Sequence, residues 1–203
     1  QDELVFDGAS FVLNADRNLA VQLPMFEERV AITDWSRGAG GWSCAPLPIP
    51  PAMPRMEQIY RAMMLGLRDY VDKNRFPGVV LGLSGGIDSA ISAAVAADAL
   101  GPARVRAVMM PSPYTSRESL EDAEECARLL GIRYETIPIG PAMEAFHQML
   151  APAFGNRAPD ITEENIQSRS RGLILMAMSN KFGDMLLTTG NKSEMSVGYA
   201  TLY

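Results

Sequence analysis

The sequence predicts an α/β protein with a doubly wound parallel sheet, preceded by a partial β-rich segment. From about residue 56 onward, short apolar runs suited to buried strands alternate with longer runs of helical spacing, which is the pattern of a parallel sheet covered by helices. A glycine pair within Ser84–Ser89 joins one apolar run to an alanine-rich run, as in a strand, a tight turn and a helix. Glycine and proline crowd residues 36–55 and separate the two regions.

The overall composition is that of an ordinary globular protein. Of the 203 residues, 47% are hydrophobic and 21% are charged, and the formal net charge is −6. This acidic balance argues against nucleic acid as a partner. Two cysteines, Cys44 and Cys126, are too few for a disulfide framework, and no signal peptide or long apolar span is present, so we expect a cytoplasmic protein with no membrane partner. Since the chain begins with Gln1 and ends at Tyr203 close to a site loop, we expect it to be part of a longer protein.

Residues 1–35 have a strand-like pattern. The apolar runs 10–13 and 19–23 flank a stretch suited to a turn, which predicts a β-hairpin, and residues 29–33 are a third strand candidate. Three such strands cannot build a core alone, so we expect residues 1–35 to end a larger β-rich domain. Residues 36–55 are then expected to be a linker, flexible first and stiff later.

Strands and helices alternate from residue 56 to residue 203. Because such alternation favours a parallel sheet, we expect ligands at the carboxyl ends of its strands. Three loops should lie there, beginning at Ser84, Met110 and Thr189. The expected strands span about 79–83, 105–110, 132–139 and 185–189, and the expected helices span about 56–71, 90–100, 115–130 with a capping box from Thr115 to Glu118, 141–150 and 162–181.

The loop Ser84–Ser89 has the features of a phosphate site. Its glycines let backbone N–H groups approach an anion, and the helix N-terminus adds the positive end of its dipole. The hydroxyls of Ser84 and Ser89 are potential donors. Asp88 would repel phosphate unless a cation lay between them, and Mg²⁺ suits one or two carboxylates with phosphate oxygens. No lysine follows the glycines, so this is not a Gly-x-x-x-x-Gly-Lys loop; the alternative is an ordinary glycine turn with two capping serines.

Two further polar motifs follow. In Thr189–Glu194, Thr189 can donate to a ribose or phosphate oxygen, and Glu194 is a second carboxylate that could reach a cation at Asp88. Asn165 and Arg169 are four residues apart and share a helix face, where an amide and a guanidinium could hold a polar ring and a phosphate. The alternatives are a merely polar turn for the first motif and a solvated helix start for the second.

Taken together, the motifs resemble those of NAD synthetase, a member of the PP-loop ATP pyrophosphatases with an adenine-nucleotide α-hydrolase-like fold. Ser84–Ser89 resembles the loop common to PP-loop enzymes, whereas Glu164–Arg169 and Thr189–Glu194 resemble motifs more specific to NAD synthetase, and Gly198–Tyr203 extends the likeness. The first 13 residues resemble the end of a nitrilase-type glutaminase domain. The resemblance therefore implies a glutamine-dependent form, with residues 1–35 ending the glutaminase domain, residues 36–55 as linker and residues 56–203 as a synthetase domain that continues past Tyr203.

The resemblance also implies a reaction. The nicotinate carboxylate of deamido-NAD would attack the α-phosphorus of ATP, and ammonia would then displace AMP from the adenylated intermediate to give NAD. The ammonia would come from glutamine hydrolysed by an upstream domain whose catalytic residues precede Gln1. A homo-oligomer, dimeric or larger, is implied as well.

The implied site has three groups of residues. Asp88 and Glu194 would be catalytic as ligands of Mg²⁺. Asn165 and Glu194 would contact deamido-NAD, to which we add Arg169 from its shared helix face. The residues implied to bind ATP are Gly82, Leu83, Ser84, Gly85, Gly86, Ile87, Asp88, Ser89 and Thr189.

Two other functions are compatible with the first loop alone. One is a different PP-loop enzyme, such as a GMP synthetase-like or tRNA-modifying ligase; the tRNA version predicts a basic surface, against which the net charge of −6 argues. The other is a nucleotide-binding regulatory domain, which needs the loop but not two metal-binding carboxylates.

Overall fold

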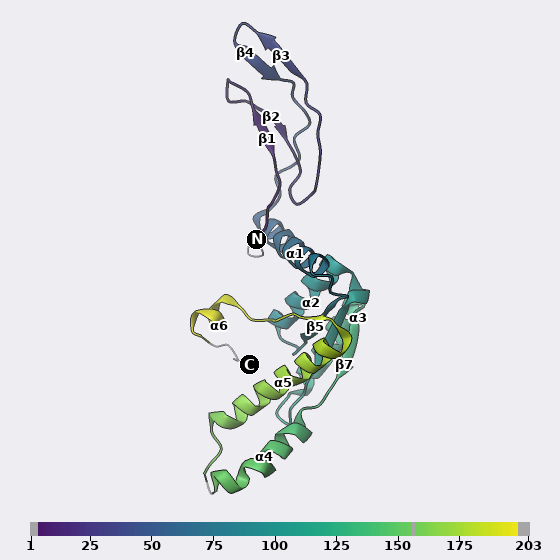
Figure 1. Ribbon diagram of the computed structural model, residues 1–203, viewed down its shortest axis with the longest axis vertical. Coiled ribbons are helices and arrows are strands. Elements are labelled where there is room, and N and C mark those ends of the chain that lie inside the picture. The colour runs from purple at the N-terminus through teal and green to yellow at the C-terminus, as the bar shows by residue number, and fades with distance from the viewer. Residues whose placement is uncertain (1–3, 156, 199–203) are drawn as a thin grey trace. The chain divides into compact units, whose positions relative to one another are not determined.

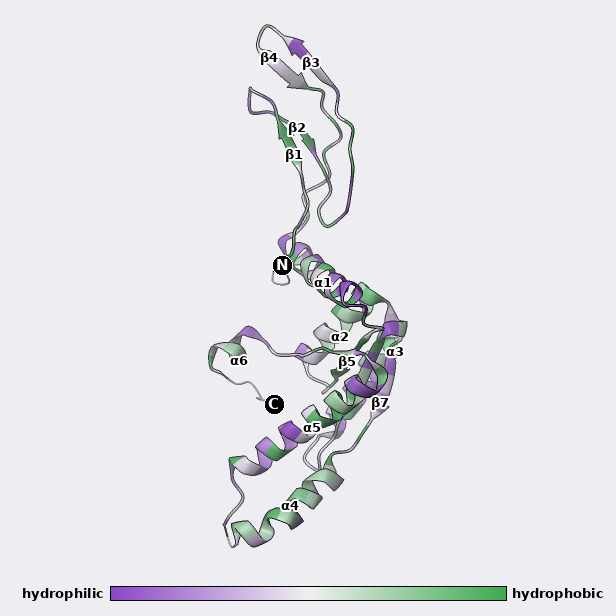
Figure 2. Ribbon diagram, in the orientation of Figure 1, coloured by the Kyte–Doolittle hydropathy of each residue, from purple (hydrophilic) through white to green (hydrophobic). Residues whose placement is uncertain are grey.

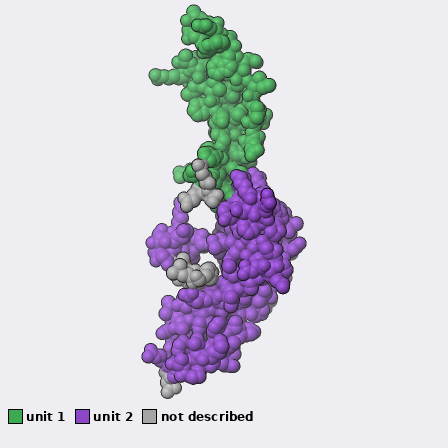
Figure 3. Space-filling model, viewed as in Figure 1, with its two compact units in different colours: residues 1–66 green, residues 67–203 purple. Residues whose placement is uncertain are grey.

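The chain forms two compact units. The computed structural model describes residues 4–155 and 157–198, and the predicted continuation of the family motif at 199–203 lies outside them. Unit 1 spans residues 1–66 and unit 2 spans residues 67–203, as the two colours of Figure 3 show. Helix α1 (Arg55–Lys73) contributes residues to both. No helix in the described ranges is long and apolar enough to cross a membrane.

Unit 1 contains two antiparallel hairpins. Strands β1 (Phe11–Leu13) and β2 (Leu19–Gln22) form the first, as predicted, and β3 (Trp35–Gly38) and β4 (Gly41–Cys44) form the second. The amide of Asn14, in the first turn, joins them: its Oδ1 accepts from the Cys44 backbone N–H at 2.8 Å and its Nδ2 donates to the Cys44 carbonyl at 3.1 Å. The buried side chains of Ala20, Val21 and Cys44 form a small core here.

Two predictions for the first 55 residues are wrong. Residues 29–33 form no strand, and the strand begins at Trp35 instead. The glycine-rich start of the expected linker is a hairpin, in which Gly41 adopts a φ of 102° beside a two-residue turn. Glycine there serves turn geometry rather than flexibility. A nitrilase-type fold is not evident in the described residues of this unit.

The sheet of unit 2 is parallel, as predicted. It consists of β5 (Val79–Gly82), β6 (Val105–Met109), β7 (Arg133–Thr136) and β8 (Met185–Leu186), in the spatial order β7-β6-β5-β8. The chain moves outward from β5 through β6 to β7, and then returns to add β8 on the other side of β5. The order of the strands therefore reverses at β5, and ligands of such sheets bind in the crevice at this reversal.

The longer helices agree with the sequence prediction except at their ends, whereas the short α6 lies where a loop was predicted. They are α2 (Ile87–Leu100), α3 (Arg117–Leu130), α4 (Gly140–Phe154), α5 (Ile161–Phe182) and the short α6 (Lys192–Ser196), with a 3₁₀ turn at Pro102–Arg104. Helix α4 is longer than predicted and is coloured hydrophobic along most of its length in Figure 2.

The predicted cap of α3 is wrong by one residue. Ser116, not Thr115, is the N-cap, and its Oγ accepts from the Ser119 N–H at 3.1 Å. Thr115 Oγ1 instead accepts from the Ser112 N–H at 2.9 Å and closes the loop after β6. The spacing from Thr115 to Glu118 has the form of a capping box, but the adjacent Ser116 can serve as the cap equally well.

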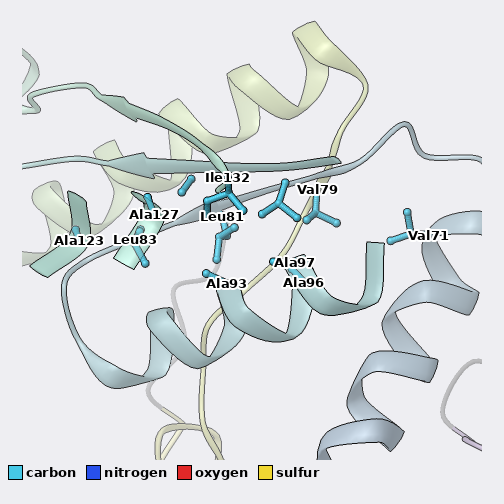
Figure 4. Close-up of a cluster of buried hydrophobic side chains, with 12 residues drawn as sticks. Val71, Val79, Leu81, Leu83, Ala93, Ala96, Ala97, Ala123, Ala127 and Ile132 are labelled. Atoms are coloured by element: carbon cyan, nitrogen blue, oxygen red, sulfur yellow. The ribbon is translucent and has the colours of Figure 1, made fainter. Parts of the chain in front are cut away.

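Helices cover both faces of the sheet. Val79 and Leu81 of β5 point toward the alanines of α2, as Figure 4 shows, and α3 packs on the same face. Val80 points the other way, into a cluster that includes Ile139 and residues of α5. This alternation confirms the doubly wound fold and explains why β5 reads as an unbroken apolar run.

Leu81→Ala is expected to lower the free energy of unfolding by about 2–5 kcal/mol, because it leaves a cavity in a fully buried strand. Leu129→Ala is the matched control: Leu129 is 70% exposed, and its change should stay within about 0.5 kcal/mol. Urea unfolding of both variants makes the comparison. Similar losses in the two would contradict the assignment of β5 to the core.

Candidate active site

A pocket of about 370 Å³ opens at the carboxyl end of the sheet. It lies between the segments that follow β5 and β8, where the strand order reverses, and one face of α5 closes it. Its lining residues are Gly82, Leu83, Ser84, Val108, Met109, Met110, Thr115, Ser168, Arg171, Gly172, Leu175, Leu186, Leu187, Thr188 and Thr189. The loops expected at Ser84, Met110 and Thr189 therefore do meet at one site.

Gly85 gives the loop after β5 its sharp turn. Its φ is +83°, and a Cβ placed on it would lie 2.4 Å from the carbonyl oxygen of Ser119 in α3. Both the backbone conformation and the close approach of α3 exclude a side chain. Leu83, just before the turn, points into the core, so only its backbone is available to a ligand.

The two serines of the loop bond to each other and to the loop backbone. Ser89 Oγ donates to the Gly86 carbonyl at 2.9 Å and accepts from the Ser84 N–H at 3.1 Å. Since the Ser89 proton is used, the 3.1 Å contact between the two hydroxyls has Ser84 as donor. The Ser84 oxygen in turn accepts from the Gly86 N–H at 3.3 Å. These hydroxyls hold the loop in shape, which differs from the expectation that they are free to donate to phosphate.

The N-terminus of α2 supplies backbone donors instead. Gly86 is the N-cap, and no side chain in the described residues caps this helix. The first intrahelical bond is from Ala90 to Gly86, so the N–H groups of Ile87, Asp88 and Ser89 have no partner within the helix. Together with the helix dipole they form a site for a phosphate.

Asp88 meets the loop that follows β8. Asn191 Nδ2 donates to Asp88 Oδ2 at 3.1 Å, across 103 residues of sequence. Asn191 is also the N-cap of α6: its Oδ1 accepts from the Glu194 N–H at 3.0 Å, and its own N–H donates to Glu194 Oε2 at 2.9 Å. Asn191 thus contacts both predicted metal-binding carboxylates, and the structure brings together Asp88 and Glu194 through it.

The donor set at this point fits Mg²⁺. Two carboxylates are present, and the described ranges contain no group of three or more His, Cys, Asp or Glu side chains that could hold a metal ion. Mg²⁺ ordinarily takes one or two carboxylates and completes its shell with substrate phosphates and water. Asp88 and Glu194 would hold it beside the phosphate-binding N-terminus of α2.

The predicted residues of α5 do not line the pocket. Asn165 and Arg169 lie on an exposed side of the helix, whereas the pocket face carries Ser168, Arg171 and Gly172. Residues 169 and 171 are about 200° apart around a helix, so they cannot share that face. The contact of Asn165 and Arg169 with deamido-NAD remains a prediction. Thr189, in contrast, does line the pocket.

Arg171 is a pocket residue that sequence reasoning missed. Its Nε donates to the Met110 carbonyl at 3.1 Å, which ties α5 to the end of β6. Burial lowers the pKa of the Arg171 guanidinium, because a charge loses hydration in the pocket, but an arginine stays cationic at neutral pH. The spacing of Ser168, Gly172 and Leu175 marks this face of α5 in the sequence and would have included Arg171.

Comparison with known families decides the affiliation of the chain. The model of the family described as NAD synthase matches residues 59–203. The chain belongs to the NAD synthase family. This NAD synthase region contains the whole of the pocket and both carboxylates.

Individual relatives agree with this family assignment. The glutamine-dependent NAD(+) synthetase of Rhodobacter capsulatus is 59% identical over 203 residues, which are 100% of this chain and 37% of the relative. The structure of the glutamine-dependent NAD+ synthetase of Acinetobacter baumannii with ADP is 49% identical, with a TM-score of 0.95 over 100% of this chain and 38% of that one. The NH3-dependent NAD synthetase of Campylobacter jejuni is 32% identical, with a TM-score of 0.66 over 75% of this chain and 63% of that one. The chain thus spans little more than a third of the length of its glutamine-dependent relatives.

Gly85→Ala is expected to cost at least about 1–3 kcal/mol of unfolding free energy, the usual cost of a strained backbone, and to weaken ATP binding because the loop must move away from Ser119. Gly40→Ala is the control, since Gly40 has no positive φ and no atom within 4 Å of an added Cβ. Calorimetric titration with ATP and urea unfolding measure the two effects. Wild-type ATP affinity in Gly85→Ala would contradict the assigned role of the loop.

Proposed function

We propose that the full-length protein converts deamido-NAD to NAD with ATP, releasing AMP and pyrophosphate. One observation carries this proposal: two carboxylates from distant parts of the chain, Asp88 and Glu194, meet through Asn191 beside an uncapped helix N-terminus. That combination can hold a polyphosphate and its cation together. Membership of the NAD synthase family supports the choice of substrate.

The proposed reaction has two steps. The nicotinate carboxylate oxygen bonds to the α-phosphorus of ATP, and the bond from that phosphorus to pyrophosphate breaks. Ammonia then bonds to the carboxyl carbon, the bond from that carbon to the AMP oxygen breaks, and the nitrogen loses a proton. The protein mainly positions the reactants and balances charge. Mg²⁺, when bound, would neutralise charge on the phosphates.

The binding of ATP is assigned to the loop after β5 and to Thr189. The N–H groups of Ile87, Asp88 and Ser89 at the start of α2 would bind its phosphates. Gly82, Leu83, Ser84 and Thr189 line the pocket. The A. baumannii relative was solved with ADP, which supports the binding of an adenine nucleotide. Deamido-NAD is proposed to contact Glu194 and, on the exposed side of α5, Asn165 and Arg169.

The ammonia is proposed to come from glutamine. Residues 1–35 would end a nitrilase-type glutaminase domain, residues 36–55 would connect it, and residues 56–203 would form the synthetase domain. Support comes from the R. capsulatus relative, which aligns with all 203 residues, whereas the NH3-dependent C. jejuni structure covers only 75% of the chain. A cytoplasmic location and a homo-oligomeric state, dimeric or larger, belong to the same proposal.

The other PP-loop functions have less support. A GMP synthetase-like or tRNA-modifying enzyme would share the Ser84 loop, but the family match extends through residue 203. A regulatory nucleotide-binding domain has no need of Glu194 beside Asp88.

The deciding experiment incubates the full-length protein with ATP, Mg²⁺, deamido-NAD and either glutamine or ammonium, and follows the products by mass spectrometry. We expect NAD, AMP and pyrophosphate from both nitrogen sources. NAD from ammonium alone would contradict the assignment of residues 1–35 to a glutaminase. Absence of AMP under all conditions would contradict the proposed reaction.

Glu194→Gln is expected to lower kcat by about 100-fold or more while part of the ATP affinity remains, because charge stabilisation by a metal ion contributes several kcal/mol to the transition state. Glu144→Gln, on the exposed surface of α4, should leave both quantities unchanged. Steady-state kinetics and equilibrium binding of ATP measure them. Unaltered turnover in Glu194→Gln would contradict the metal assignment.

A further inference from the structure

Asn191 holds three hydrogen bonds at the meeting point of two loops. Its side-chain nitrogen donates to Asp88 Oδ2, its side-chain oxygen accepts from the Glu194 N–H, and its backbone N–H donates to Glu194 Oε2. The two bonds to Glu194 form a capping box at the start of α6. The bond to Asp88 is a separate contact, made to the first turn of α2.

The position requires a side chain that donates and accepts at once. The oxygen of Asn191 is fixed by the Glu194 N–H, so the nitrogen must face Asp88. Serine makes an equally good helix cap, but its single hydroxyl is shorter and cannot serve both loops. An ionised aspartate also caps well, but it only accepts hydrogen bonds and would repel Asp88.

Each carboxylate keeps one oxygen available. Asn191 contacts Oδ2 of Asp88 and Oε2 of Glu194. Within residues 4–155 and 157–198, Oδ1 of Asp88 and Oε1 of Glu194 make no hydrogen bond or ion pair. Asp88 is exposed on the surface of α2 and would otherwise rotate freely. One oxygen of each group is therefore oriented by Asn191, and the other is left for a cation.

We propose that Asn191 is a positioning residue that holds Asp88 and Glu194 in the arrangement needed to bind a divalent cation together with ATP. This inference rests on the proposed function and deepens it, because it names the residue that orients the two carboxylates. Partners of metal ligands ordinarily change metal affinity by about 10–100-fold when they are lost.

The test uses Asn191→Ser in the full-length protein. The serine keeps the cap of α6 but loses the donor to Asp88. The probe is Mn²⁺, whose binding in the presence of ATP is followed by electron paramagnetic resonance. We expect Mn²⁺ to bind about tenfold more weakly than to wild type in the presence of ATP, while the affinity for metal-free ATP stays unchanged because the loop after β5 is intact. Raising the Mg²⁺ concentration should restore turnover.

Two further variants keep the result unambiguous. Asp160→Ser changes the cap of α5, which carries the same capping box, and should leave Mn²⁺ binding as in wild type. Asn191→Gly also lacks the amide, and glycine at a helix cap costs only a few tenths of a kcal/mol relative to asparagine, so it should match Asn191→Ser.

Three results would overturn the inference. Wild-type Mn²⁺ affinity in both Asn191 variants would show that the amide does not position the carboxylates. Loss of metal-free ATP binding in both would show that Asn191 maintains the loop instead. Absence of any ATP-dependent Mn²⁺ site in wild type would show that Asp88 and Glu194 do not bind a divalent cation with ATP. Each is distinguishable from failure of the proposed function, which is read from the NAD product of the wild-type protein.

Discussion

Strand β5 is the constraint on which the rest of unit 2 depends. It is hydrogen-bonded to β6 on one side and to β8 on the other, and helices bury both of its faces. Because both edges and both faces of β5 are in contact with other elements, the strand cannot shift, and the position of the turn that follows it is fixed. The loop after β8 is then placed beside that turn because β8 pairs directly with β5. The pocket is a consequence of this pairing.

The loop after β5 divides its polar groups between two tasks. Its side-chain hydroxyls bond within the loop, and its backbone N–H groups at the start of α2 remain for a ligand. Recognition by backbone does not require a particular side chain at Ile87, which is 78% exposed. It does require a glycine at position 85, because a Cβ there would lie 2.4 Å from the carbonyl oxygen of Ser119 in α3. The residues with the strictest requirement are therefore those that shape the loop.

Much of the fold was predictable because its signals are local. The apolar run of β5 and the alanines of α2 identify their elements without knowledge of the rest of the chain. The hairpin at 35–44 was missed because glycine in a tight turn resembles glycine in a linker. Arg171 and Asn191 were missed for another reason: their partners, Met110 and Asp88, are 61 and 103 residues away. The packing of α5 on the sheet brings the first pair together, and the pairing of β8 with β5 brings the second pair together.

The segment after β8 has a thermodynamic property that follows from its small size. Helix α6 has five residues and no buried side chain, so it gains almost nothing from a core and depends on its capping box and on Asp88. Such a segment opens at low free-energy cost. A ligand that binds only the ordered form must therefore offset the free energy of ordering the segment. By linkage, any change that orders the segment also raises the affinity for that ligand. Order in this loop and occupancy of the proposed cation site at Asp88 and Glu194 rise and fall together.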